Sequence, residues 1–160
     1  MRILGIDPGL RITGYGLVDM NGAKVTLLET GTIAPVVKQS FENRIKKIYD
    51  HLEDLIKEYK PDIMVLEKLY THTHHPTTAS LLGHVRGVIC LLSAQHKLKF
   101  AEQSVRRIRK AVIGRGGASK LQTRGMVAHV LRVDERKLTQ DASDALALAI
   151  GYCQFALNKI

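Results

Sequence analysis

Three apolar segments in the first third of the chain predict strands. Residues 2–7 are apolar almost without alternation, which is typical of a strand buried on both faces. Residues 15–20 and 24–33 follow, with Asn21 and Gly22 between them. Both residues of this pair tolerate a positive φ, which favours a tight hairpin. The segment is therefore predicted to be an antiparallel meander of three strands.

From residue 40 onward, the apolar spacing changes to three and four residues, which indicates helices. Ser40 is a candidate N-cap for the first helix, and Pro61 follows its end. Residues 62–67 are a short apolar run that ends in a carboxylate, so they are predicted to be another strand. Further helices are expected over residues 77–96, 104–113, 118–131 and 142–157, with a strand at 97–102. This order predicts an α/β fold with a mixed sheet.

The length and the cysteines indicate an intracellular protein. A chain of 160 residues favours one domain, here 1–160, with a core that needs no disulfides. Cys90 and Cys153 lie in apolar helical stretches, and we expect both to be buried free thiols. We find no signal peptide pattern and no apolar run of the ~18 residues that a membrane span requires. A cytoplasmic location, without membrane contact, is expected.

The positive charge of the chain is concentrated in one block. Lysine and arginine number 24 against 15 acidic residues, a formal charge of +9. Between residues 103 and 133 there are no acids, and the basic residues are Arg106, Arg107, Arg109, Lys110, Arg115, Lys120, Arg124 and Arg132. Such a block indicates binding to a polyanion such as nucleic acid, although a solvated helix face would have the same composition.

Four acids stand out against the apolar segments. Asp7 and Glu67 end two predicted strands, and Asp141 and Asp144 lie near the start of the last helix. Taken singly, each has a structural explanation. Asp7 precedes Pro-Gly as a turn residue, Glu67 is solvated at a strand end, and Asp141 caps the helix. If the two strands are adjacent and parallel, however, all four acids meet at one edge of the sheet.

Carboxylates gathered in this way need a positive counter-charge, because like charges raise one another's pKa. Hard divalent cations with oxygen ligands, such as Mg²⁺, supply it, and a pair of such ions promotes phosphodiester hydrolysis. We therefore expect two Mg²⁺ ions, with Mn²⁺ as a substitute. The glycines after Asp7 are expected to leave room at the strand tip for a phosphate backbone.

Five segments together resemble a known family. In chain order they read GIDPGLRITGYG, VLEKLY, LLGHVRGV, VIGRGGASK and DASDALALAI. These motifs resemble the bacterial RuvC family of Holliday-junction resolvases, within the ribonuclease-H-like superfamily. The resemblance implies a mixed five-stranded sheet flanked by helices, and a homodimer that nicks four-way DNA junctions symmetrically in recombination and repair. It also implies that Asp7, Glu67, Asp141 and Asp144 are catalytic metal ligands.

The same resemblance implies several DNA contacts. Tyr70 stands where the family has an aromatic residue that stacks on junction bases, and Lys120 matches a functional lysine. Arg109 occupies a position that is often lysine. With these we expect further DNA contacts from the basic side chains, namely Arg86, Arg106, Lys110 and Arg115. The branch-migration proteins RuvA and RuvB are implied partners.

Other interpretations remain open at this point. The histidines of THTHH, namely His72, His74 and His75, could bind zinc, but we expect them to line the DNA groove. An RNA-processing nuclease of the same superfamily would share the acids. A non-catalytic junction-binding module would bind without nicking. ATPases of the actin and sugar-kinase class also carry G-I-D-x-G, but they generally need two domains.

Overall fold

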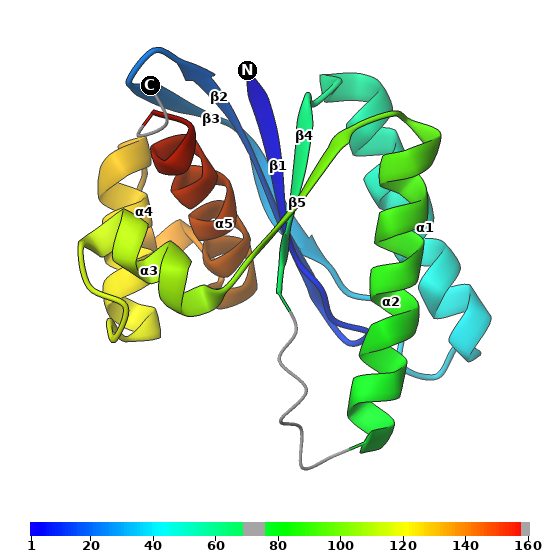
Figure 1. The fold of residues 1–160 in the computed structure, drawn as a ribbon. Coiled ribbons are helices and arrows are strands. Elements are labelled where there is room, and N and C mark those ends of the chain that lie inside the picture. Colours follow the sequence, from blue (N-terminus) through cyan, green and yellow to red (C-terminus); the bar gives the residue numbers. More distant parts are fainter. Residues whose placement is uncertain (69–75, 158–160) are drawn as a thin grey trace.

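A computed structural model describes residues 1–68 and 76–157, and its centre is a mixed five-stranded sheet (Figure 1). The strands lie in the order β3-β2-β1-β4-β5. Their bounds are β1 Arg2–Asp7, β2 Thr13–Asn21, β3 Lys24–Ile33, β4 Ile63–Glu67 and β5 Lys99–Gln103.

The pairing of the strands confirms the predicted meander. Strand β1 is antiparallel to β2, and β2 is antiparallel to β3. Gly22 turns the hairpin between β2 and β3 with a φ of 58°. Strand β1 is parallel to β4, and β4 is parallel to β5. The carboxyl ends of these three strands therefore lie at the same edge of the sheet.

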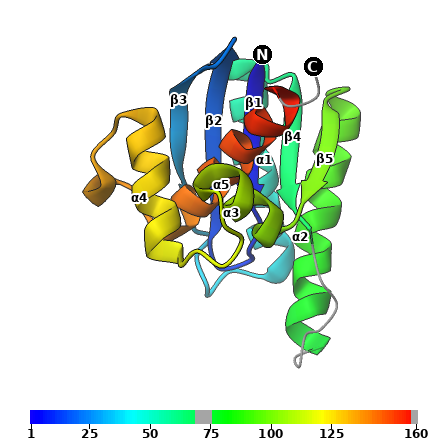
Figure 2. The ribbon, with the colours of Figure 1, turned by 60° about the vertical axis from the view of Figure 1, so that its left-hand side comes forward.

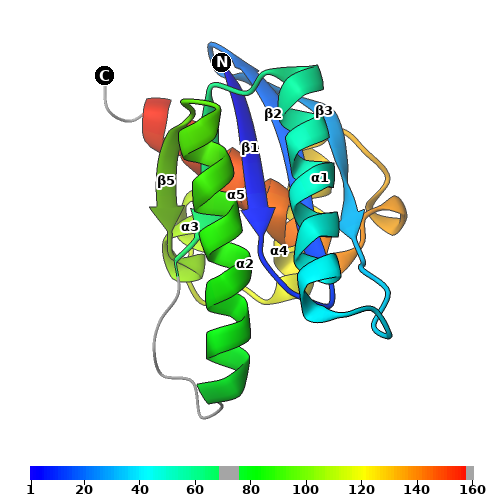
Figure 3. The same ribbon diagram turned by 90° about the vertical axis from the view of Figure 1, so that its right-hand side faces the viewer.

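Helices cover both faces of the sheet. Helices α1 and α2 cover one face (Figure 3), and α3, α4 and α5 lie on the other (Figure 2). Their bounds are α1 Phe41–Tyr59, α2 Pro76–Gln95, α3 Val105–Ile113, α4 Lys120–Leu131 and α5 Gln140–Leu157, with a 3₁₀ turn at Glu135–Lys137. This architecture confirms the predicted fold class.

The core has two parts because successive strand residues point to opposite faces. Ile3 belongs to the cluster under α5, and Leu4 belongs to the cluster under α1 and α2. Both side chains are fully buried. This two-sided burial explains why residues 2–7 show almost no alternation of apolar and polar positions.

Glycines in β1 and β2 bring α5 directly onto the sheet. A Cβ at Gly5 would lie 2.1 Å from the carbonyl oxygen of Ala145, and one at Gly14 would lie 2.1 Å from that of Asp141. Only a hydrogen fits at these positions. We expected the glycines after Asp7 to make room for a phosphate backbone. Instead, Gly14 and Gly16 make room for α5, which places the acids of that helix beside the strand tips.

The structure excludes the helix-capping explanation for Asp141 and corrects one expectation about the cysteines. Asp141 does not cap α5, because the helix already begins at Gln140. The hydroxyl of Thr139 accepts the hydrogen bond from the backbone N–H of Ala142, at 3.2 Å. Cys153 is buried, and its burial raises the thiol pKa to about 12, but Cys90 is exposed.

Helix α2 departs from the expectation that no segment is long and apolar enough for a membrane span. Its stretch Thr77–Gln95 is long and apolar enough to cross a membrane, judged by length and composition alone. In this fold, α2 packs Val85, Ile89 and Leu92 onto the sheet. Only 22% of the stretch is buried, so α2 exposes an apolar outer face.

Candidate active site

Asp7 and Glu67 lie side by side at the carboxyl ends of β1 and β4. The register that pairs Ile6 with Leu66 brings the two acids, one residue further along, to the same edge. Both side chains are half-buried. In open α/β sheets, ligands collect at such an edge where the strand direction or order changes. Here β1 is antiparallel to one neighbour and parallel to the other.

Helix α5 adds Asp144 to this edge. Its side chain is 18% exposed and is held from two sides. The ammonium of Lys120 lies 3.1 Å from one carboxylate oxygen, and the amide of Gln140 donates to the other at 3.1 Å. Gln140 and Asp144 are one helical turn apart, so α5 itself aligns this pair.

A cavity of about 140 Å³ joins the three acids to two basic residues. Asp7, Glu67 and Asp144 line it together with Arg109 of α3 and Lys120 of α4. Asp141 does not line this cavity. It lines a neighbouring groove instead, although its charge still raises the pKa of Asp7. The structure thus gathers three of the four predicted acids around one cavity and leaves Asp141 at the margin.

The acids are short of positive charge. Burial and the negative charges of Glu67 and Asp144 raise the pKa of Asp7 to about 7. Burial also raises the pKa of Glu67, with Asp144 adding to the effect, whereas Lys120 and Arg86 oppose it. Both pKa shifts have the same origin, which is buried negative charge with too few cations beside it.

These carboxylates suit a hard divalent cation, which binds carboxylate oxygens and would offset their negative charge. Among residues 1–68 and 76–157, no three His, Cys, Asp or Glu side chains already stand together at the spacing of a metal site. In this structure Asp144 is paired with Lys120 instead.

Arg86 of α2 is directed into the protein. Its guanidinium donates to the backbone carbonyl of Glu67 and forms an ion pair with Glu102 of β5. Only 13% of the Arg86 side chain is exposed. We expected Arg86 to contact DNA, but in this structure it holds the ends of β4 and β5 together. Glu102 and Gln140 are the positioning residues that the sequence analysis did not identify.

A comparison with protein-family models matches residues 3–152 to the family "Crossover junction endodeoxyribonuclease RuvC". The chain belongs to the RuvC family. The resemblance read from the five motifs is thereby confirmed, and the match reaches every strand and includes all of the acids described above.

Individual RuvC proteins support the assignment over nearly the whole chain. The crossover junction endodeoxyribonuclease RuvC of Alkaliphilus metalliredigens is 39% identical over 150 residues, which cover 94% of this chain and 91% of that protein. The corresponding protein of Chloroherpeton thalassium is 42% identical over 150 residues, covering 94% of this chain and 80% of that protein. RuvC family nucleases are divalent-metal dependent.

Solved structures of junction resolvases share the fold. Thermus thermophilus RuvC in complex with Holliday junction substrate superposes with a TM-score of 0.93 at 22% identity, covering 99% of this chain and 96% of that one. The yeast mitochondrial Holliday junction resolvase Ydc2 gives a TM-score of 0.72 at 15% identity, with 98% and 80% covered.

The remaining predicted RuvC-type DNA contacts differ in their placement. Arg106, Lys110 and Arg115 are exposed on or just after α3, the helix whose Arg109 lines the acid cavity. Tyr70 and the histidines at positions 72, 74 and 75 lie outside the described residues.

Proposed function

We propose that this protein resolves four-way DNA junctions by paired, symmetric hydrolysis of phosphodiester bonds, in homologous recombination and DNA repair. Membership of the RuvC family supports the activity. The assignment of the active site rests on the acids around the cavity beside β1 and β4. We further propose that residues 1–160 act as a single nuclease domain in the cytoplasm, where the DNA substrate is found.

Asp7, Glu67 and Asp144 are proposed to hold Mg²⁺, with Asp141 completing the set from the margin and Mn²⁺ as a substitute. Two ions are proposed for each subunit. When bound, such ions would make water more acidic and stabilise charge on the leaving oxygen. The carboxylate oxygen donors that line the cavity support this choice over a softer metal.

The chain's own cations complete the proposed site. Lys120 and Arg109 line the cavity and would offset the charge that develops on the phosphate. Lys120 is held by Asp144 in this structure, so it is already positioned beside the acids. Arg106, Lys110 and Arg115 extend the positive surface along α3 and are proposed to bind the flanking phosphates. Tyr70 is proposed to stack on junction bases.

A synthetic four-way junction, tested beside matched linear duplex with and without Mg²⁺, examines the activity directly. We expect paired nicks in the junction only, and only with the metal. Asp7→Asn should bind the junction but leave it intact. An excess of structured RNA serves as competitor. RNA cleavage in preference to the junction would contradict the proposal, as would junction binding without nicks under any metal.

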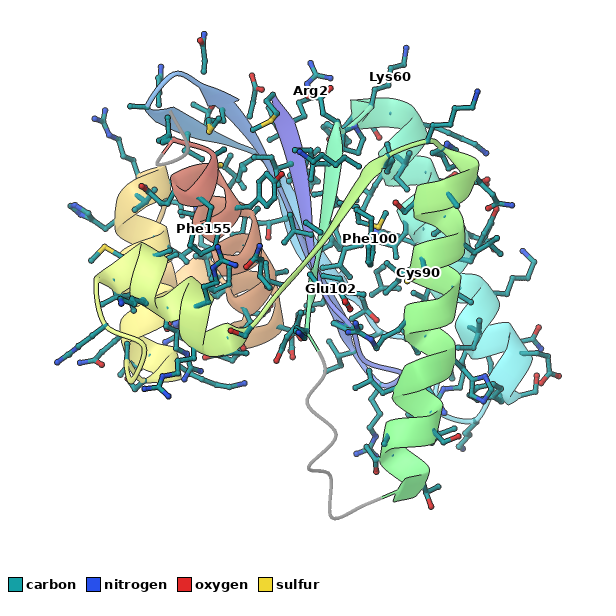
Figure 4. The ribbon with its side chains drawn as sticks, in the orientation of Figure 1. Arg2, Lys60, Cys90, Phe100, Glu102 and Phe155 are labelled. Carbon is teal, nitrogen blue, oxygen red and sulfur yellow. The ribbon has the colours of Figure 1, made fainter. Side chains whose placement is uncertain are left out.

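We propose a homodimer, formed through the outer face of α2 and the edge strand β5. Leu91 is 52% exposed and Phe100 is 37% exposed, and Cys90 lies on the same side (Figure 4). An exposed apolar face beside an unpaired strand edge favours association. RuvA and RuvB are proposed as partners from the family resemblance alone.

Sedimentation of the Leu91→Glu variant tests the dimer, with Leu121→Glu as control. Leu121 is 62% exposed on α4, away from the proposed interface. We expect Leu91→Glu alone to give monomers. Mild oxidation should also link two copies through Cys90, because Cys153 is buried. If both variants keep the mass of the wild type, the interface lies elsewhere.

A further inference from the structure

A second hollow lies at the β1–β2 turn, next to the acid cavity. We name it the turn groove. It has a volume of about 610 Å³ and lies between the turn, the start of α1 and the first half of α2. Figure 3 shows β1 ending between these two helices. The residues that characterise it are Leu10, Arg11, Ile12, Val37, Arg44 and Leu81.

The turn groove combines an apolar surface with positive charge. Ile12 is 44% exposed, Val37 is 60% exposed and Leu81 is 37% exposed, so large apolar side chains face solvent here. Arg11 and Arg44 line the same groove. The Nε of Arg44 is buried and has no hydrogen-bond partner within the described part of the chain. A ligand that has both an apolar face and an anionic group would suit these apolar side chains and the two arginines.

The turn that forms one wall of the groove is held in place. The hydroxyl of Thr13 donates to the carbonyl of Gly9 at 2.6 Å and accepts from its N–H at 3.3 Å. Arg44 donates to the carbonyl of Leu10 at 2.9 Å, which ties the turn to α1. A groove with a fixed wall loses little entropy when a ligand binds.

The groove adjoins the proposed active site. Asp141 lines the groove, and its charge acts on Asp7, which lines the acid cavity. A DNA strand whose phosphate lies at the acids must continue past this margin on one side. We propose that the turn groove receives an unstacked base next to the scissile phosphate, with Arg11 and Arg44 contacting the backbone of the same strand.

This inference rests on the proposed function, because it requires a strand bound at the acids. Enzymes that take a base out of the stack hold it between apolar or aromatic side chains. Unstacking costs least where a base has already lost a neighbour, as at the crossover of a junction. The two arginines and the continuity with Asp141 favour a DNA strand over an apolar peptide as the occupant.

Val36 and Val37 offer a matched pair of variants. Both are 60% exposed, but only Val37 lines the groove. Neither substitution by Asp removes a buried contact, so both variants should fold, which circular dichroism verifies. Val37→Asp places a negative charge where the strand is proposed to lie, and Val36→Asp places the same charge beside the groove. Ile12→Asp is a second variant within the groove.

The experiment uses 2-aminopurine, a base whose fluorescence rises when it is unstacked. It replaces, one at a time, the two nucleotides that flank the scissile phosphate. All proteins carry Asp7→Asn so that the junction stays intact. We expect a rise at one position with Asp7→Asn alone and with Val36→Asp added. The rise should be lost with Val37→Asp or Ile12→Asp.

A rise that Val37→Asp and Ile12→Asp leave unchanged would overturn the inference, because the base would then lie elsewhere. The absence of any rise while the junction is bound would also overturn it, with the proposed function intact. Failure of Asp7→Asn to bind the junction at all would refute the proposed function together with the inference.

Discussion

The guanidinium of Arg86 donates to the backbone carbonyl of Glu67 while pairing with the carboxylate of Glu102. One side chain of α2 thus holds the ends of β4 and β5, and with them the proposed metal ligand Glu67. An arginine does this well because its planar guanidinium presents several donors in fixed directions. The arrangement connects the packing of α2 to the geometry of the acid cavity.

Replacement of Arg86 should therefore impair cleavage more than DNA binding. We expect Arg86→Gln to lower the cleavage rate at saturating junction by roughly 10- to 100-fold, as is typical when a group that orients a metal ligand is lost. Arg86→Lys should recover only part of the rate. Gel-shift and single-turnover cleavage assays on the same junction separate the two effects.

Glu102→Gln provides the control for this prediction. It weakens one arm of the contact and leaves the bond to the carbonyl of Glu67, so the loss should be smaller. The opposite result would be that Arg86→Gln loses affinity for the junction to an extent that explains its whole loss of cleavage, while Glu102→Gln behaves as wild type. Arg86 would then be a DNA contact.

The raised pKa of Asp7 makes stability depend on pH. A carboxyl group whose pKa rises from 3.8 to about 7 on folding binds its proton more tightly in the folded protein. Its contribution to stability is complete below pH ~4 and is lost as the pH rises through about 7. Without metal, Asp7→Asn should therefore be more stable than wild type at pH 8, by about 2 kcal/mol once solvent screening is allowed for.

Thermal unfolding in EDTA at pH 5 and pH 8 measures this effect. The unfolding temperature of Asp7→Asn should be clearly higher than that of wild type at pH 8, and the difference should be smaller at pH 5. Mg²⁺ should stabilise wild type more than the variant. Asp54→Asn, which changes an exposed acid on α1, should show no such pattern. A variant less stable than wild type at pH 8 would mean that Asp7 has a structural role.

The sequence allowed much of the fold to be predicted, for identifiable reasons. The Asn21–Gly22 pair specifies a hairpin locally. The apolar residues between 41 and 56 recur every three or four positions, which is the period of a helix packed on one side. Asp7 and Glu67 could be grouped because the carboxyl ends of two adjacent parallel strands lie at the same edge of the sheet. Each of these inferences needs only local geometry and the direction of the strands.

The errors concern properties that depend on tertiary contacts. Leu81 and Leu91 are also exposed on α2, so an apolar neighbourhood in the sequence could not reveal that Cys90 is exposed. The sequence also could not show that Arg86 bonds to Glu67 and Glu102, and its contact with DNA stays a prediction. A helix start can be predicted from the sequence only to within a residue or two. Because α5 begins at Gln140, Asp141 lies within the helix and does not cap it.

Gln140 should matter for catalysis although it is not acidic. It donates to Asp144 at 3.1 Å and leaves the other carboxylate oxygen facing Lys120. We expect Gln140→Ala to lower cleavage by about 10-fold and to raise the Mg²⁺ concentration needed for half-maximal rate. Gln154→Ala, on the same helix and far from the acids, is the control. An unchanged Mg²⁺ requirement would remove Gln140 from the site.

Gly14 should be intolerant of even one added methyl group. A Cβ at this position would lie 2.1 Å from the carbonyl oxygen and 2.4 Å from the carbonyl carbon of Asp141, and this backbone cannot rotate away as a side chain would. Either α5 or β2 must shift. We expect Gly14→Ala to lose about 2–4 kcal/mol of stability, within the range of overpacked cores, and to lose cleavage even where it remains folded.

Gly117→Ala is the matched control, because a Cβ at Gly117 meets nothing within 4 Å and its φ is not positive. Its stability should stay within about 0.5 kcal/mol of wild type. Denaturant titration gives both values, and cleavage below the unfolding transition shows whether Asp141 and Asp144 have moved. If Gly14→Ala cleaves normally, the close contact between α5 and β2 does not set the position of the acids, and the glycine serves packing alone.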